Sequence, residues 1–93
     1  MHDLTLKDFA GHLGESYTVE AGGTPFALGL EQAQELPASG RAGGSFRLEF
    51  RGPFEPILPQ AIYEFRRGGE AFEIFVVAIG RDAEGTRYEA IFF

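Results

Sequence analysis

The chain has 93 residues, which is the length of one domain, and 44% of them are hydrophobic and 24% charged, as in an ordinary globular domain. The net charge is −6, from 14 acidic and 8 basic residues, so the overall field repels phosphates and disfavours duplex nucleic acid as a partner. The absence of cysteine excludes disulfides, thiol catalysis and thiolate metal sites. We therefore expect a single domain over residues 1–93.

The sequence also indicates where the protein resides. Its first residues lack a basic region followed by an apolar stretch, the pattern of a signal peptide. The longest unbroken apolar run, residues 74–79, has six residues and is far shorter than a membrane span. We expect a cytoplasmic protein that binds no membrane.

The N-terminal segment is predicted to form a short helix. Apolar residues recur there at helical spacing, namely Leu6, Phe9, Ala10 and Leu13. Thr5 and Asp8 resemble a capping box, and Gly14 is placed to end the helix. Because an isolated helix of about two turns is marginal in water, packing must hold it.

From residue 16 onward the pattern changes to the two-residue period of β-strands. The segments that follow it are residues 16–20, 26–30, 46–51, 61–66, 72–79 and 87–93. Residues 31–36 are ambiguous, and residues 37–44 form a polar, glycine-rich loop. Short connections predict mostly antiparallel pairing. The expected fold is all-β or β-dominated, with about six strands in a small barrel or sandwich and one short N-terminal helix.

Two of these strands carry informative side-chain patterns. In residues 46–51 the apolar residues Phe46, Leu48 and Phe50 are expected to point inward, and Arg47, Glu49 and Arg51 to face water. Residues 74–79 are apolar on both faces, which is typical of a strand that is covered on both sides or that meets a partner. We expect Phe9 and Leu13 of the helix to cover the second face, made by Phe75, Val77 and Ile79.

No catalytic, cofactor or metal site is predicted. Of the two histidines, His2 lies near the terminus and His12 near the helix end, where a cation suits the helix dipole. Acid–base catalysis would depend on carboxylates alone, and no pair of them stands out. The Gly-Gly pairs at residues 22–23, 43–44 and 68–69 lack the phosphate-loop forms and are typical of turns. An enzyme is therefore the least favoured class.

Charged residues on several strands allow two interpretations. They are Arg47, Glu49, Arg51, Glu64, Arg66, Glu73, Arg87 and Glu89. They could line a groove for an oligosaccharide or for single-stranded nucleic acid, or they could pair with each other across a solvated sheet face. Phe46 and Phe50 fall on the opposite, buried face, so no stacking platform for bases is visible, and we favour the ion-paired face.

Two apolar segments could contact a partner. Residues 54–60 form an apolar connection that either plugs one end of the barrel or serves as a docking surface. The last strand ends on large apolar residues that need to be covered. The candidate partner surface comprises Phe54, Ile57, Leu58, Ile91 and Phe93. The expected function is a non-catalytic interaction or assembly module that binds another protein or itself. The alternative is a small-molecule-binding barrel with a Phe-lined pocket.

Short motifs are spread along nearly the whole chain, among them Leu4-Thr5-Leu6, Asp8-Phe9, Leu58-Pro59-Gln60 and Arg87-Tyr88-Glu89-Ala90. Their combination resembles a family of small bacterial proteins catalogued as a domain of unknown function. The resemblance bears on the fold and contains no catalytic signature, so it implies no particular chemistry.

Overall fold

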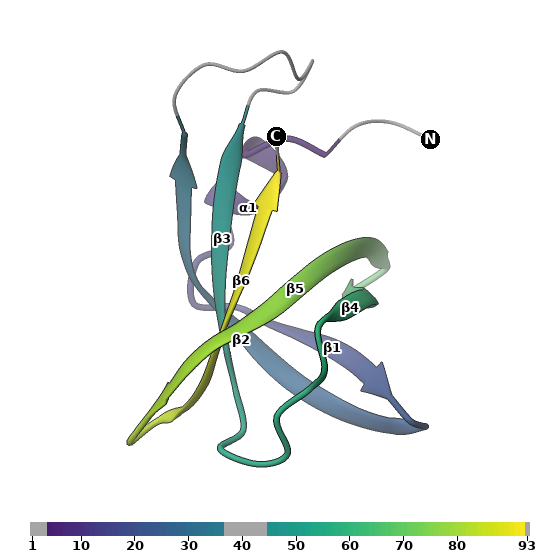
Figure 1. Cartoon of the computed structure of the whole chain (residues 1–93). Coiled ribbons are helices and arrows are strands. Elements are labelled where there is room, and N and C mark those ends of the chain that lie inside the picture. Colours follow the sequence, from purple (N-terminus) through teal and green to yellow (C-terminus); the bar gives the residue numbers. More distant parts are fainter. Residues whose placement is uncertain (1–3, 37–44, 93) are drawn as a thin grey trace.

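The computed structural model describes residues 4–36 and 45–92 and contains one helix and six strands (Figure 1). They are α1 (Lys7–Ala10), β1 (Ser16–Ala21), β2 (Thr24–Glu35), β3 (Phe46–Gly52), β4 (Ala61–Arg67), β5 (Glu70–Asp82) and β6 (Gly85–Phe92). The strands close into a barrel in the order β1-β2-β3-β6-β5-β4, and each neighbouring pair is antiparallel. The predicted β-dominated fold is confirmed, and the sheet is a barrel rather than a sandwich.

The long strands β2 and β5 each pair with two neighbours in turn (Figure 1). β5 pairs with β4 as far as Val76 and with β6 from Val77 onward, and its register with β6 shifts between Ala78 and Gly80. Such irregularities bend a strand and increase its twist, which lets β5 run along two sides of the barrel. Residues 31–36, ambiguous in sequence, continue β2 as far as Glu35.

Aromatic and aliphatic side chains fill the barrel interior. The fully buried ones include Phe9, Tyr17, Val19, Leu28, Leu30, Phe46, Leu48, Phe50, Phe65, Ile74, Val76 and Tyr88. The rings of Phe50 and Phe65 lie 4.7 Å apart between centroids, and those of Phe46 and Phe92 stack at 4.4 Å. The inward face predicted for residues 46–51 is therefore confirmed.

The helix is shorter than predicted because the chain after it joins the barrel early. α1 has four residues, and the Asp8 carboxylate accepts a hydrogen bond from the Thr5 N–H at 2.8 Å. Gly14 adopts a left-handed conformation (φ +86°), and its N–H donates to the Leu30 carbonyl at 2.8 Å. This backbone contact with β2 ends the helical path within one turn.

Phe9 of α1 fills the barrel end instead of covering the outside of β5. Its ring packs against those of Tyr17, Phe46, Phe72 and Phe92, with centroids 5.3 to 6.4 Å away. Leu13 is 52% exposed, and Phe75 and Ile79 are exposed as well. The prediction that the helix covers Phe75, Val77 and Ile79 is wrong. A one-turn helix has one large buried side chain, Phe9, and this side chain packs into the end of the barrel.

The connection at residues 53–60 lies at the lower end of the barrel (Figure 1). Leu58 is buried in the core, and its N–H donates to the Tyr88 hydroxyl at 2.9 Å. The Tyr63 hydroxyl donates to the Pro59 carbonyl at 2.6 Å. Phe54 and Ile57 remain exposed. One residue of this connection therefore plugs the barrel, and two apolar residues stay on its surface.

Three sequence-based expectations concern residues outside the described ranges: His2 near the terminus, the loop at residues 37–44, and Phe93. Within the described ranges, no helix combines the length and the apolar character that a membrane crossing requires.

Candidate protein-interaction surface

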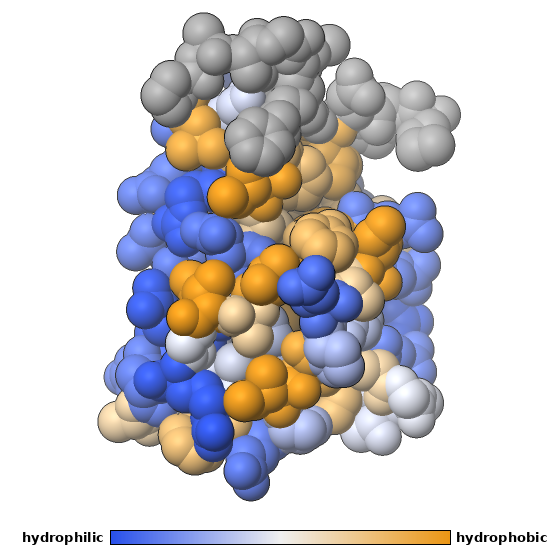
Figure 2. Space-filling model, viewed as in Figure 1, coloured by the Kyte–Doolittle hydropathy of each residue, from blue (hydrophilic) through white to orange (hydrophobic). Residues whose placement is uncertain are grey.

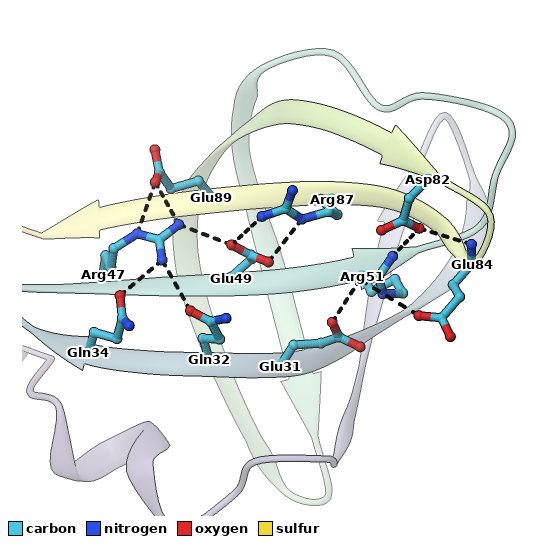
Figure 3. Close-up of polar contacts among 10 residues, drawn as sticks. All are labelled: Glu31, Gln32, Gln34, Arg47, Glu49, Arg51, Asp82, Glu84, Arg87 and Glu89. Carbon is cyan, nitrogen blue, oxygen red and sulfur yellow. Dashed lines mark hydrogen bonds and ion pairs between the residues drawn. The ribbon is translucent and has the colours of Figure 1, made fainter.

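One outer face of the barrel carries a network of charged and amide side chains, which we call the arginine–carboxylate network (Figure 3). Its members are Glu31, Gln32, Gln34, Arg47, Glu49, Arg51, Asp82, Glu84, Arg87 and Glu89. Each of its three guanidinium groups has a carboxylate oxygen within 3.0 Å. The network spans the sheet from β2 across β3 to β6.

The ion pairs of this network run diagonally between β3 and β6. In register, like charges lie directly opposite each other, Glu49 beside Glu89 and Arg51 beside Arg87. Arg47 Nη2 contacts the Glu89 carboxylate at 2.7 Å, and Arg87 Nη2 contacts the Glu49 carboxylate at 2.9 Å. The diagonal contacts offset a repulsion that the register alone would impose. The geometry fits the ion-paired face inferred from sequence.

Glu49 is 4% exposed, so the expectation that it faces water is wrong. Arg87 and Arg47 approach its carboxylate from two sides and cover it with their long side chains (Figure 3). The hydrogen bonds from Arg87, strengthened by those from Arg47, hold the pKa of the Glu49 carboxyl below its usual value. Strand alternation does not reveal such burial, because it depends on covering by other side chains, Arg47 of the same strand and Arg87 of the neighbouring strand β6.

Arg51 ties the far end of the network to the β5–β6 turn. Its guanidinium contacts Glu31 at 3.0 Å and also pairs with Asp82. The hydrogen bond from Arg51, together with the one from the Glu84 N–H, lowers the pKa of the Asp82 carboxyl. These cations are engaged by the protein's own carboxylates, which leaves them poorly suited to binding an anionic ligand.

We expect the buried carboxylate of Glu49 to make folding stability depend on acidic pH. Because its pKa is depressed in the folded state, its contribution is present above the unfolded value of about 4.3 and is lost as pH falls through the folded value. Glu49→Gln should lower the free energy of unfolding at neutral pH by about 2 kcal/mol. Urea unfolding from neutral to acidic pH should show a smaller loss in this variant than in the wild type.

The matched control is Glu35→Gln, an exposed glutamate at the end of β2. Its loss of stability with acid should parallel that of the wild type. If Glu49→Gln also parallels the wild type across the acid range, the network does not depress this carboxyl.

A second outer face, on β4 and β5, has a different character. We call it the β4–β5 face and define it by Ile62, Glu64, Glu73 and Phe75. Ile62 lies directly opposite Phe75 across the two strands, and these side chains are 66% and 49% exposed. The next row pairs Glu64 with Glu73. Figure 2 has the same view as Figure 1, in which β5 crosses the front. It shows apolar residues on this side of the molecule, with hydrophilic residues at the margins.

The predicted partner residues do not form one surface. Phe54, Ile57 and Ile91 are exposed, Leu58 is in the core, and Phe93 lies outside the described residues. The Thr86 hydroxyl donates to the Phe54 carbonyl at 3.2 Å, which places that loop near the start of β6. Ile91 is five residues further along the strand, about 17 Å away at 3.3 Å per residue.

Sequence reasoning missed Ile62. Alternation puts Tyr63 and Phe65 on one face of β4, and Phe65 is fully buried. The same alternation places Ile62 on the outward face with Glu64 and Arg66. An isoleucine among outward charged residues was the available signal.

Few described residues combine in a way that supports catalysis. His12 Nδ1 lies 2.9 Å from the Glu15 carboxylate in an exposed contact. The Tyr17 hydroxyl accepts a hydrogen bond from Arg67, and burial raises the pKa of Tyr17, which keeps its phenol neutral. Within residues 4–36 and 45–92, no group of three or more histidine, aspartate or glutamate side chains is arranged to hold a metal ion.

Comparison with protein families places the barrel among known sequences. Residues 4–92 match the family described as a domain of unknown function, DUF6916. The chain belongs to this family. The match includes α1 and all six strands, so the DUF6916 unit corresponds to the whole barrel, and the resemblance seen in the sequence motifs is confirmed. No curated protein and no solved structure matches the chain.

Proposed function

We propose that this DUF6916 barrel is a non-catalytic interaction module that binds another protein through the β4–β5 face. The observation that carries the proposal is the exposed cross-strand pair of Ile62 and Phe75. An aromatic and a β-branched residue in direct register form a contiguous apolar contact, and large apolar side chains of this kind serve as anchors when a partner covers them.

The packed interior supports a binding surface on the outside over a ligand pocket inside. Tyr17 alone meets the rings of Phe9, Phe50, Phe65 and Phe72 within 6.4 Å between centroids. These rings occupy the space that a small molecule would need in the alternative, Phe-lined barrel. The carboxylates of the arginine–carboxylate network are held by arginines, which supports a non-catalytic role.

A second copy of the chain is the other candidate occupant, and one observation favours it. Ile91, near the end of β6, has a side chain that is 42% exposed. An exposed apolar side chain of this size can be covered by a second copy of the chain.

For location, we infer the cytoplasm, because cysteine-free sequences suit a reducing compartment.

The β4–β5 face can be tested with a double variant, Ile62→Ser with Phe75→Ser. We expect wild-type protein immobilised on beads to capture a defined protein from cells of its host and the double variant to lose at least nine-tenths of that capture, about 1.4 kcal/mol. Quantitative mass spectrometry measures the captured protein. Because both side chains are exposed, the melting temperature should change by no more than about 2 °C.

The matched control is Ile57→Ser with Ile91→Ser, which removes two exposed apolar residues at other places on the barrel. Capture should survive in this variant. Equal capture by all three proteins would show that the β4–β5 face is not the binding surface.

A further inference from the structure

The β4–β5 face holds a like-charge pair of which the fold neutralises only one member. Glu64 and Glu73 lie directly opposite each other on the two strands, an arrangement that destabilises a sheet. Arg66 Nε lies 3.5 Å from the Glu64 carboxylate, and the same guanidinium also contacts Glu20 at 2.5 Å. Glu73 has no ion-pair partner within the part of the chain that the structure describes. Arg66 thus contacts two of these three carboxylates, and Glu73 is the one that it leaves without an ion pair among the described residues.

The arginine–carboxylate network, on the other outer face, also contains two glutamates in opposed positions, and there both are neutralised. Between β3 and β6, Glu49 and Glu89 also lie directly opposite each other, and each receives an arginine on the diagonal. The corresponding diagonal neighbours of Glu73 on β4 are Ile62 and Arg66, and Arg66 turns toward Glu64 and Glu20. This partly neutralised pair therefore lies next to the exposed apolar pair on the same two strands.

We propose that the occupant of the β4–β5 face is a basic, apolar segment of another protein, in which aliphatic or aromatic side chains cover Ile62 and Phe75 and lysine or arginine side chains reach Glu64 and Glu73. The inference rests on the proposed function and names its partner chemistry. Charge complementarity carries it: the face is apolar at one row and carries two carboxylates at the next, one of which has no ion pair among the described residues.

The same charges disfavour a second copy at this face. A two-fold interface sets a surface against itself, so two β4–β5 faces in contact would gather four carboxylates. The chain as a whole carries a net charge of −6, which adds to the repulsion. Anionic membranes and nucleic acids are repelled by the same carboxylates. A cationic protein segment is the partner that gains from all of these groups.

A labelled peptide of alternating lysine and leucine residues serves as the probe, measured by fluorescence anisotropy against the wild type and two variants. Glu64→Gln with Glu73→Gln removes the pair on the face. Glu35→Gln with Glu84→Gln makes the same change in net charge elsewhere, at exposed positions. We expect the first variant to weaken binding about tenfold and the second less than twofold, and the difference to shrink at high salt.

A second readout separates recognition from a structural role. Removing the like-charge pair relieves repulsion in the free protein, so Glu64→Gln with Glu73→Gln should raise the melting temperature by about 2 °C while it weakens binding. A carboxylate pair that merely supported the fold would lower the melting temperature. A peptide with glutamate in place of every lysine should not bind.

Three outcomes would overturn the inference. Equal weakening by both glutamine variants would mean that the peptide senses only total charge. A dimer in light scattering that is lost in Ile62→Ser with Phe75→Ser would make a second copy the occupant. Host-protein capture that needs Ile62 and Phe75 but tolerates Glu64→Gln with Glu73→Gln would leave the proposed function standing without its basic partner.

Discussion

Replacing Phe9 with alanine is expected to lower the free energy of unfolding by about 3 to 4 kcal/mol. The Phe9 side chain is fully buried and its ring meets four other aromatic rings at one end of the barrel. Alanine would leave a cavity, because the strands that surround the ring are fixed by their hydrogen-bonded neighbours and cannot collapse inward. Urea unfolding followed by circular dichroism measures the loss.

Leu13→Ala is the matched control, from the same short segment. Because Leu13 is 52% exposed, its truncation should cost no more than about 0.5 kcal/mol. The contrast separates anchoring by one ring from a general contribution of the N-terminal segment. A loss below about 1 kcal/mol for Phe9→Ala would show that the barrel end is stable without this ring.

Replacing Gly85 with alanine is expected to have an effect at least as large, about 4 kcal/mol or more, and to reduce the yield of folded protein. Gly85 begins β6 after the tight turn from β5. Its φ is +138°, a backbone conformation that residues with a side chain rarely adopt. A Cβ atom at this position would lie 2.1 Å from the Gly52 carbonyl oxygen of β3. Backbone strain and a backbone clash therefore act together, and neither can be relieved by a side-chain movement.

Gly68→Ala isolates the contribution of backbone conformation alone. Gly68 also has a positive φ, +60°, but a Cβ there would meet nothing within 4 Å. This variant should lose about 1 kcal/mol in the same urea unfolding experiment. Comparable losses for Gly68→Ala and Gly85→Ala would mean that β3 moves away and that the close approach to Gly52 is not needed.

Much of the fold followed from local patterns in the sequence. Alternation predicted the strands and placed Phe46, Leu48 and Phe50 inward, and all three are buried. Glycines marked the hairpin connections, as at Gly68, whose positive φ suits a tight turn. These features could be predicted because strand period and turn conformation depend on residues a few positions apart.

The candidate site was only partly visible. The outward position of Ile62 follows from alternation, but its pairing with Phe75 depends on the register between β4 and β5. The sequence suggested that the helix would cover Phe75. Phe9 of the helix packs into the barrel end instead, and Phe75 stays exposed. Exposure of an apolar residue depends on what the rest of the chain leaves uncovered, which no local pattern contains.

Composition, alternation and turn residues determined by themselves that the fold is β-dominated with a Phe-rich interior. Only the tertiary structure decided that the strands close into a barrel, that Glu49 is buried between Arg47 and Arg87, and that Glu64 faces Glu73. Closure depends on β3 meeting β6 and β1 meeting β4, strands that are distant in the sequence. Charges find their diagonal partners only after that pairing and its register are set, because a shift of one residue would turn every side chain to the other face.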